Sequence, residues 1–166
     1  LSGNSLPPTV VDADGLNFLA TKENWWQYLT TPTITTPHPG EMSRLTGIST
    51  PTIGEDRVSV ALNAAKQWDQ IVVLKGAFTI IANGHGQASI SPFANPALAS
   101  AGTGDVLAGA IAGLLGQGLD PYEAGQLGVY LHGLAATIVS QELGDTGMLA
   151  SDLLLALPKA TMSLAK

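Results

Sequence analysis

The stretch that decides the fold is NPALASAGTGDVLAGAIAGLLGQG, residues 95–118, in which a run of small residues leads directly into a helical pattern. Glycines at positions 102 and 104 allow backbone N–H groups to turn toward a common point. A helix start adds further free N–H groups and the positive end of the helix dipole, so an anion is stabilised there. The apolar residues that follow recur at helical spacing and predict one buried face: Val106, Leu107, Ala110, Ile111, Leu114 and Leu115.

The acid at the start of this predicted helix, Asp105, has two interpretations. In the first, Asp105 or Thr103 caps the helix by accepting a hydrogen bond from its first turn. In the second, Asp105 is a general base held next to a bound phosphate. The stretch by itself leaves both open.

Composition limits the classes of protein to consider. The chain has 166 residues, 45% hydrophobic and 12% charged, which predicts one folded domain. A net charge of −6 argues against nucleic acid or an anionic membrane as the main partner, although an anionic small molecule can still bind to local amides and lysines. The absence of cysteine excludes disulfides and thiolate chemistry. No apolar run is long enough to span a bilayer and no leader sequence is recognisable, so we expect a cytoplasmic protein.

The order of predicted elements indicates an α/β layered fold with a largely parallel sheet and flanking helices. Residues 1–8 are expected to form a loop. Strands are predicted at 9–14, 33–36 and 71–74, and a hairpin at 78–82 and 87–91 around Asn83-Gly84. Helices are predicted at 15–19, 41–45, 52–68, 121–142 and 149–157, the last ended by Pro158.

Four polar residues follow strands or begin helices and are expected to converge on one edge of the sheet: Asp14, His38, Lys75 and Asp105. Each of the first three has a structural alternative. Asp14, like Asp12, could only cap a turn; His38, stiffened between two prolines, could only fill a hydrogen-bonding position; Lys75 could be a solvated lysine instead of a phosphate contact.

Two further features have mainly structural interpretations. His132 lies inside the long helix and is expected to be a satisfied core or interface residue. Trp25, Trp26 and Tyr28 are expected to pack a helix onto the domain, with stacking against a base as the alternative.

Several stretches together resemble the ADP- or ATP-dependent NAD(P)H-hydrate dehydratases of the ribokinase-like superfamily. These are VVDADGLNFLA (10–20), TPHPGEMSRL (36–45), VVLKGAFTIIA (72–82), residues 95–118, GVYLHGLAA (128–136) and LASDLL (149–154). The Gly-Thr-Gly-Asp segment alone indicates only the superfamily. Its joint occurrence with PHPGEM and LKGAFT is much more specific.

The resemblance implies a role for each matching residue. Asp105 would be the general base that contacts the substrate, and Gly102 and Gly104 would form the anion hole. The nucleotide would be bound by Lys75, Gly76, Ala77, Phe78, Thr79, Asn95, Thr103 and Gly104. His38, Asp14 and Asn17 would contact the hydrated dinucleotide, and no residue is expected to be a metal ligand.

The implied activity repairs a damaged cofactor. Hydrated NADH or NADPH would be dehydrated with ADP or ATP as co-substrate and Mg²⁺ on the nucleotide phosphates. The family's domain normally begins with additional βα units, so residues 1–166 are expected to form one ribokinase-like domain that lacks them. A sheet cut at that point would expose an apolar edge, and self-association through this edge or through helix 121–142 is a further expectation. Some relatives also carry a fused epimerase domain.

Two rival functions remain open at this stage. A small-molecule kinase of the same superfamily, acting on a vitamin-precursor alcohol, would use the same aspartate and anion hole but release a stable phosphate ester. A non-catalytic nucleotide-binding or oligomerisation module is the alternative from another class.

Overall fold

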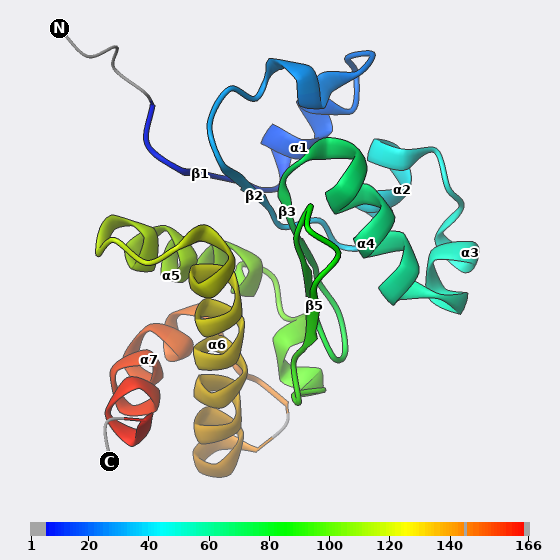
Figure 1. The fold of residues 1–166 in the computed structure, drawn as a ribbon. Helices are drawn as coiled ribbons and strands as arrows, with labels where there is room; N and C mark the ends of the chain where they lie inside the picture. The colour runs from blue at the N-terminus through cyan, green and yellow to red at the C-terminus, as the bar shows by residue number, and fades with distance from the viewer. Residues whose placement is uncertain (1–5, 145, 165–166) are drawn as a thin grey trace, which may run out of the picture.

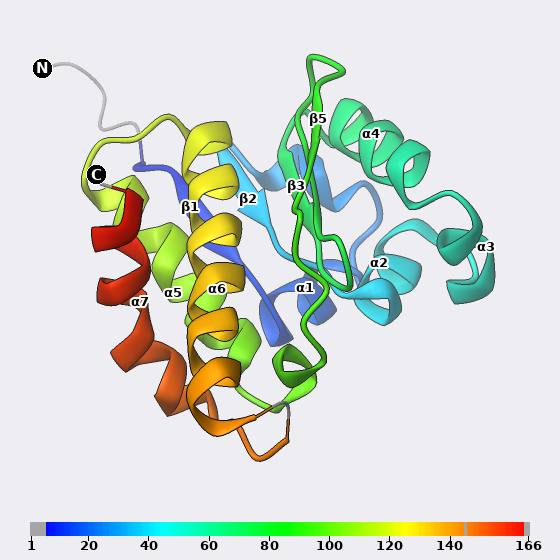
Figure 2. The same cartoon turned by 90° about the horizontal axis from the view of Figure 1, so that it is seen from below.

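The structure, a computed structural model, describes residues 6–144 and 146–164, and the first five residues of the loop expected at 1–8 lie outside that part. Its strands are β1 (Thr9–Val11), β2 (Thr33–Thr35), β3 (Ile71–Leu74), β4 (Ile80–Ala82) and β5 (Ala88–Ile90). Its helices are α1 (Asp14–Leu19), α2 (Pro39–Thr46), α3 (Thr50–Glu55), α4 (Arg57–Trp68), α5 (Thr103–Gly116), α6 (Pro121–Leu143) and α7 (Ala150–Leu164), with 3-10 turns η1 (Trp25–Tyr28) and η2 (Pro96–Ala99). Helices α1 to α4 cover one face of the sheet and α5 to α7 the other, as Figure 1 and Figure 2 show.

The strands lie in the order β1-β2-β3-β4-β5. Strands β1, β2 and β3 run parallel, with Val10 opposite Ile34 and Ile34 opposite Ile71. The predicted hairpin then adds β4 and β5 in antiparallel pairing. The layered α/β fold expected from the order of elements is confirmed. Because the three parallel strands end at the same edge, the residues that follow them meet there.

The central strands are buried on both faces, which explains the unbroken apolar sequence of β3. Val72 and Leu74 pack among the side chains of α1, α2 and α4. Val73, between them, packs with Leu107 and Ile111 of α5 on the opposite face.

The tryptophans of η1 pack in the hydrophobic core on the α1 side of the sheet. Trp25 is 2% exposed, and its ring centroid lies 4.6 Å from that of Trp68 at the end of α4. Trp26 meets the Trp25 ring edge-on at 5.8 Å. The packing role expected for this cluster is confirmed for Trp25, whereas Tyr28 remains 71% exposed.

The single helix predicted over 52–68 is wrong, because the structure divides it at Asp56. Helix α3 ends at Glu55, and Asp56 takes a non-helical conformation with φ −147°. The Asp56 carboxylate accepts a hydrogen bond from the backbone N–H of Ser59 at 3.0 Å and so begins α4. A capping aspartate inside an apolar periodic pattern starts a new helix where the continuous pattern suggested one element.

The predicted end of the last helix at Pro158 is also wrong. Helix α7 continues through Pro158 to Leu164. Its buried residues, Leu153, Ala156 and Ala160, lie at helical spacing on both sides of the proline and pack against α6. This continuous packed face outweighs the hydrogen bond that proline cannot donate.

Helix α6 packs between the sheet, α5 and α7, and these elements cover its buried residues. Strand β1 pairs only with β2, so one side of the described sheet is an open edge. Among the described residues, no helix combines the length and the apolar character needed to cross a bilayer.

The contact between α5 and α6 depends on a missing side chain at Gly128. A Cβ atom there would lie 2.5 Å from Cγ1 and 3.4 Å from the Cα of Ile111. We expect Gly128→Ala to lower the free energy of unfolding by about 1–3 kcal/mol, because the overlap forces the two helices apart. Urea unfolding followed by far-UV circular dichroism measures the change.

The matched control is Gly54→Ala in α3, where a Cβ would have no neighbour within 4 Å. This substitution is expected to be neutral or to raise the free energy of unfolding by up to about 1 kcal/mol through helix propensity. Equal destabilisation by the two substitutions would contradict the proposed packing constraint.

Candidate active site

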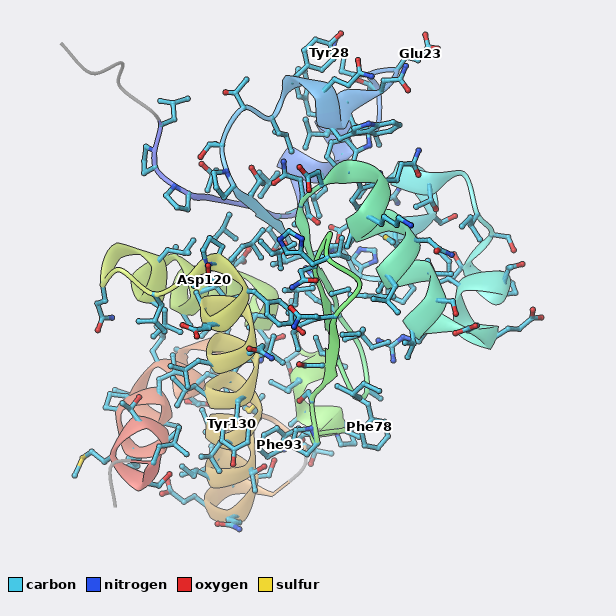
Figure 3. All side chains as sticks on the ribbon, in the orientation of Figure 1. Glu23, Tyr28, Phe78, Phe93, Asp120 and Tyr130 are labelled. Carbon is cyan, nitrogen blue, oxygen red and sulfur yellow. The ribbon has the colours of Figure 1, made fainter. Side chains whose placement is uncertain are left out.

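A cavity of about 540 Å³ opens at the carboxyl edge of the sheet, between the β3–β4 connection, η2 and the start of α5. Eight of the residues predicted to bind substrate or nucleotide line this cavity: His38, Lys75, Gly76, Ala77, Thr79, Asn95, Thr103 and Gly104. Apolar walls come from Phe93, Leu98 and Leu107. The ring of Phe93 meets Tyr130 of α6 at 5.2 Å, and Figure 3 shows both, with Phe78, in the lower half of the view, away from Glu23 and Tyr28 at the top.

The first turn of α5 has no side-chain cap, which contradicts the capping interpretation of Asp105 and Thr103. The N-cap residue is Gly102, in the left-handed conformation with φ 84°. The Thr103 hydroxyl points back to the preceding turn, where it donates to the carbonyls of Leu98 (2.7 Å) and Ser100 (2.9 Å). Nothing among the described residues accepts a hydrogen bond from the backbone N–H of Gly104 or Asp105. These two amides are therefore available to a ligand.

Lys75 lies beside this helix start, between two carboxylates. Its Nζ is 2.7 Å from Oδ1 of Asp12 and 3.7 Å from Oε2 of Glu41, and its side chain is 19% exposed. The interpretation of Lys75 as a freely solvated lysine is therefore wrong. A Cβ at Gly104 would lie 3.4 Å from Nζ and 3.7 Å from Oδ2 of Asp12, so this ion pair lies within van der Waals distance of the helix start. The pair holds the Lys75 ammonium group beside the start of α5.

His38 caps helix α2. Its Nδ1 accepts hydrogen bonds from the backbone N–H groups of Gly40 (3.0 Å) and Glu41 (3.3 Å), while the Glu41 carboxylate accepts from the His38 N–H at 2.8 Å. This reciprocal arrangement is a capping box. Because Nδ1 is occupied as an acceptor, the ring proton of the neutral imidazole is on Nε2. The side chain is half exposed and lines the cavity, so the capping role and a ligand contact are compatible.

His132 connects α6 to the first turn of α5. Its Nε2 lies 2.8 Å from the carbonyl oxygen of Thr103, and only a donor can satisfy that oxygen, so Nε2 carries the proton. Burial lowers the pKa of His132 to about 4; the hydrogen bond to Thr103 opposes this shift and the charge of Lys75 adds to it. The ring is thus neutral at physiological pH. The expected core role is confirmed, and the same residue also lines the cavity.

Several predicted site residues lie outside the cavity lining. Asp105 is exposed on the first turn of α5, directly after the lining residues Thr103 and Gly104. Asp14 is the first residue of α1, whose N-cap is Ala13, so Asp14 is not the cap. Asn17 accepts a hydrogen bond from Arg44 at 3.0 Å and is 3.5 Å from Asp14.

Two remaining glycine and aromatic positions flank the cavity. Gly102 is exposed at the N-cap of α5, and Phe78 is 52% exposed with φ 53° in the β3–β4 connection. Neither belongs to the cavity lining.

Sequence reasoning missed several residues that build this edge. Asp12 was recognised as an acid at a strand end, but not as the partner of Lys75. Glu41 was not singled out, although its spacing of three residues from the cap residue is the signal of a capping box. Phe93 and Arg57 carry no sequence signal, because their roles depend on contacts between distant segments.

The described residues contain no group of three or more histidine, aspartate or glutamate side chains placed to hold a metal ion.

The fold and the position of the cavity define a ribokinase-like protein. A ribokinase-like superfamily protein of Enterococcus faecalis is 27% identical, with a TM-score of 0.78 over 93% of this chain and 52% of that one. The model of the NAD(P)H-hydrate dehydratase family matches residues 3–159, and the chain belongs to this family.

Two relatives illustrate the similarity. The bifunctional NAD(P)H-hydrate repair enzyme Nnr of Moorella thermoacetica is 50% identical over 151 residues, which cover 91% of this chain and 28% of the relative. The ADP/ATP-dependent NAD(P)H-hydrate dehydratase of Bacillus subtilis, co-crystallised with ATP and Mg²⁺, is 37% identical with a TM-score of 0.85. That similarity covers 94% of this chain and 55% of the Bacillus chain. The chain thus spans less than two thirds of the length of each.

The buried His132 gives the domain a defined response to acid. Its unfolded pKa is near 6.5 and its folded pKa is about 4, so the unfolded state binds more protons between these values. Stability is therefore full above pH 6.5 and falls as the pH decreases toward 4. From pH 7 to 4.5 we expect this group to cost about 2 kcal/mol in the free energy of unfolding.

Urea unfolding of the protein and of His132→Gln at both pH values isolates this contribution. The glutamine amide can still donate to Thr103 but does not titrate in this range, so the variant should lose about 2 kcal/mol less than the unaltered protein. An identical pH dependence in both proteins would contradict the buried, neutral state of His132.

Proposed function

We propose that this protein dehydrates the hydrated form of NADH or NADPH with ADP or ATP as co-substrate, and so repairs a damaged cofactor. The observation that carries the proposal is the uncapped start of α5, where two free amides open beside the cavity and next to the Asp105 carboxylate. Family membership supports the reaction type. The nucleotide dependence of the Bacillus subtilis relative supports the co-substrate.

The chemical problem is that hydroxide is a poor leaving group. The ring hydroxyl oxygen attacks the terminal phosphorus of the nucleotide, and the bond between that phosphorus and the bridging oxygen breaks. Asp105 accepts the hydroxyl proton as a general base. Its exposed position on the first turn of α5 suits contact with a large second substrate at the cavity rim.

The charge that moves with the phosphoryl group is stabilised by the protein backbone. The N–H groups of Gly104 and Asp105 are fixed by the helix before the reaction begins, so they need no reorganisation to receive phosphoryl oxygens. Mg²⁺ bound to the nucleotide phosphates supplies additional neutralisation. The carboxylates of Asp12 and Glu41 offset the charge of Lys75, so this cluster supplies no net positive charge at this edge, which makes these amides important.

Elimination completes the reaction. The lone pair of the ring nitrogen expels phosphate as the carbon–oxygen bond breaks, and loss of a proton from the neighbouring ring carbon restores the dihydropyridine. In this proposal His38 and the segment with Asp14 and Asn17 contact the hydrated dinucleotide, whereas Lys75 to Thr79, Asn95, Thr103 and Gly104 contact the nucleotide.

Activity is tested on the complete gene product with hydrated NADH or NADPH, Mg²⁺ and either ADP or ATP. We expect the absorbance of the reduced nicotinamide to return while phosphate is released in equal amount. A stable phosphate ester without recovered absorbance would indicate a small-molecule kinase. Nucleotide binding without turnover would indicate a non-catalytic module. The protein would act in aqueous solution on these small molecules, and the cytoplasm is its proposed location.

Asp105→Asn is expected to reduce kcat by about 10²–10⁴-fold, the range of a lost general base. The amide keeps the shape of the side chain but cannot accept the proton at neutral pH. Steady-state assays of phosphate release measure the loss.

Glu123→Gln is the matched control, because Glu123 is an exposed acid in the first turn of α6. It should retain normal turnover. Normal turnover by Asp105→Asn would show that Asp105 is not the general base. The comparison of Asp105→Asn with Glu123→Gln does not bear on the nucleotide site.

A further inference from the structure

The side chain of Arg57, the first residue of α4, is held entirely by backbone oxygens of the β3–β4 connection. Its Nη2 donates to the carbonyls of Leu74 (3.1 Å) and Lys75 (3.2 Å), and its Nη1 donates to the carbonyl of Ala77. No carboxylate of the described residues forms an ion pair with it, and its Nε is buried without a partner. A guanidinium in this position acts as a fixed fork that sets the direction of three peptide groups.

Those three carbonyls determine where the opposite N–H groups point. In a trans peptide the C=O and the following N–H point in opposite directions, and the described chain has no cis peptide. The N–H of Lys75 thus points away from Arg57 and donates to Pro37 at 2.8 Å, and that of Phe78 points away and donates to Phe93 at 2.9 Å. The third N–H that points away from Arg57 is that of Gly76, in the same peptide group as the carbonyl of Lys75.

The N–H of Gly76 differs from the other two because it has no acceptor among the described residues. The N–H of Ala77 also has no acceptor among the described residues. It belongs to the same peptide group as the carbonyl of Gly76, which accepts a hydrogen bond from the Thr79 hydroxyl at 2.9 Å. Gly76 and Ala77 both line the cavity. Two unpaired amides of this connection therefore border the cavity that Gly104 of α5 also lines.

Glycine at position 76 is required by the same arrangement. Its φ of 139° lies in a region that L side chains rarely adopt, and a Cβ there would be 3.0 Å from Nη2 of Arg57. Both the backbone conformation and the close approach of the Arg57 guanidinium therefore favour glycine at this position.

We propose that Arg57 is a positioning residue of the nucleotide site, which orients the amide of Gly76, beside that of Ala77, as a donor to a phosphate oxygen of the nucleotide. The assignment rests on the proposed function, because it takes ADP or ATP as the occupant of the cavity. Arg57 acts through the backbone from behind the loop and does not line the cavity.

The test compares binding of ADP with binding of adenosine, which lacks the phosphates. Isothermal titration of the complete gene product is carried out with the unaltered protein, Arg57→Met and Arg57→Lys. Arg57→Met should raise the Kd for ADP at least about tenfold but change the Kd for adenosine by less than about twofold. Arg57→Lys keeps the charge but not the fork, so its Kd for ADP should be intermediate.

The matched control is Lys66→Met, which removes one positive charge from an exposed position on the same helix. Its Kd for ADP should be unchanged. Methylguanidinium added to an Arg57→Ala variant should restore part of the ADP affinity, which would not follow from a general loss of folding.

Three results would overturn the assignment. Unchanged ADP affinity in Arg57→Met would show that the loop amides do not depend on Arg57. An equal loss of ADP and adenosine affinity in both Arg57→Met and Arg57→Lys would indicate a merely structural role. Failure of the unaltered protein to bind either ADP or ATP would instead overturn the proposed function, and the assignment with it.

Discussion

The structure depends on the close contact between the start of helix α5 and the carboxyl edge of the parallel strands. The ion pair of Lys75 and Asp12 lies against the helix at Gly104. His132 holds the same turn from the other side through the Thr103 carbonyl. The positive end of the helix dipole and the free amides are thereby fixed at the point where the strands end, beside the cavity.

Charge is distributed around this contact in an unusual way. The lysine expected to bind phosphate is shared by two carboxylates, and the one nearby histidine of α6 is kept neutral by burial. Arg57 is bound only to carbonyl oxygens behind the β3–β4 connection. The site therefore offers an anion oriented backbone amides more than free side-chain charge. Such amides are selective in direction and need little rearrangement when charge moves in a reaction.

The larger features of the fold were predictable because they depend on local patterns. Apolar runs gave the buried strands, the Asn-Gly turn gave the hairpin, and the helical spacing after Gly104 gave α5. The errors occurred where a local signal competed with another interaction. Asp56 starts a helix inside a continuous apolar pattern, whereas Pro158 fails to end one because α7 remains packed against α6 on both sides of it.

By itself, the sequence determined the layered α/β class, the start of α5 at the Gly-Thr-Gly segment and the Lys-Gly and Pro-His-Pro-Gly segments whose residues line the cavity. These depend on backbone freedom at glycines, the stiffness of prolines and the spacing of apolar side chains, which are properties of short stretches. The tertiary structure alone decided that Lys75 pairs with Asp12, that His132 holds Thr103 and that Arg57 orients the β3–β4 connection. Each of these contacts joins residues at least 17 positions apart, so no local pattern can encode it.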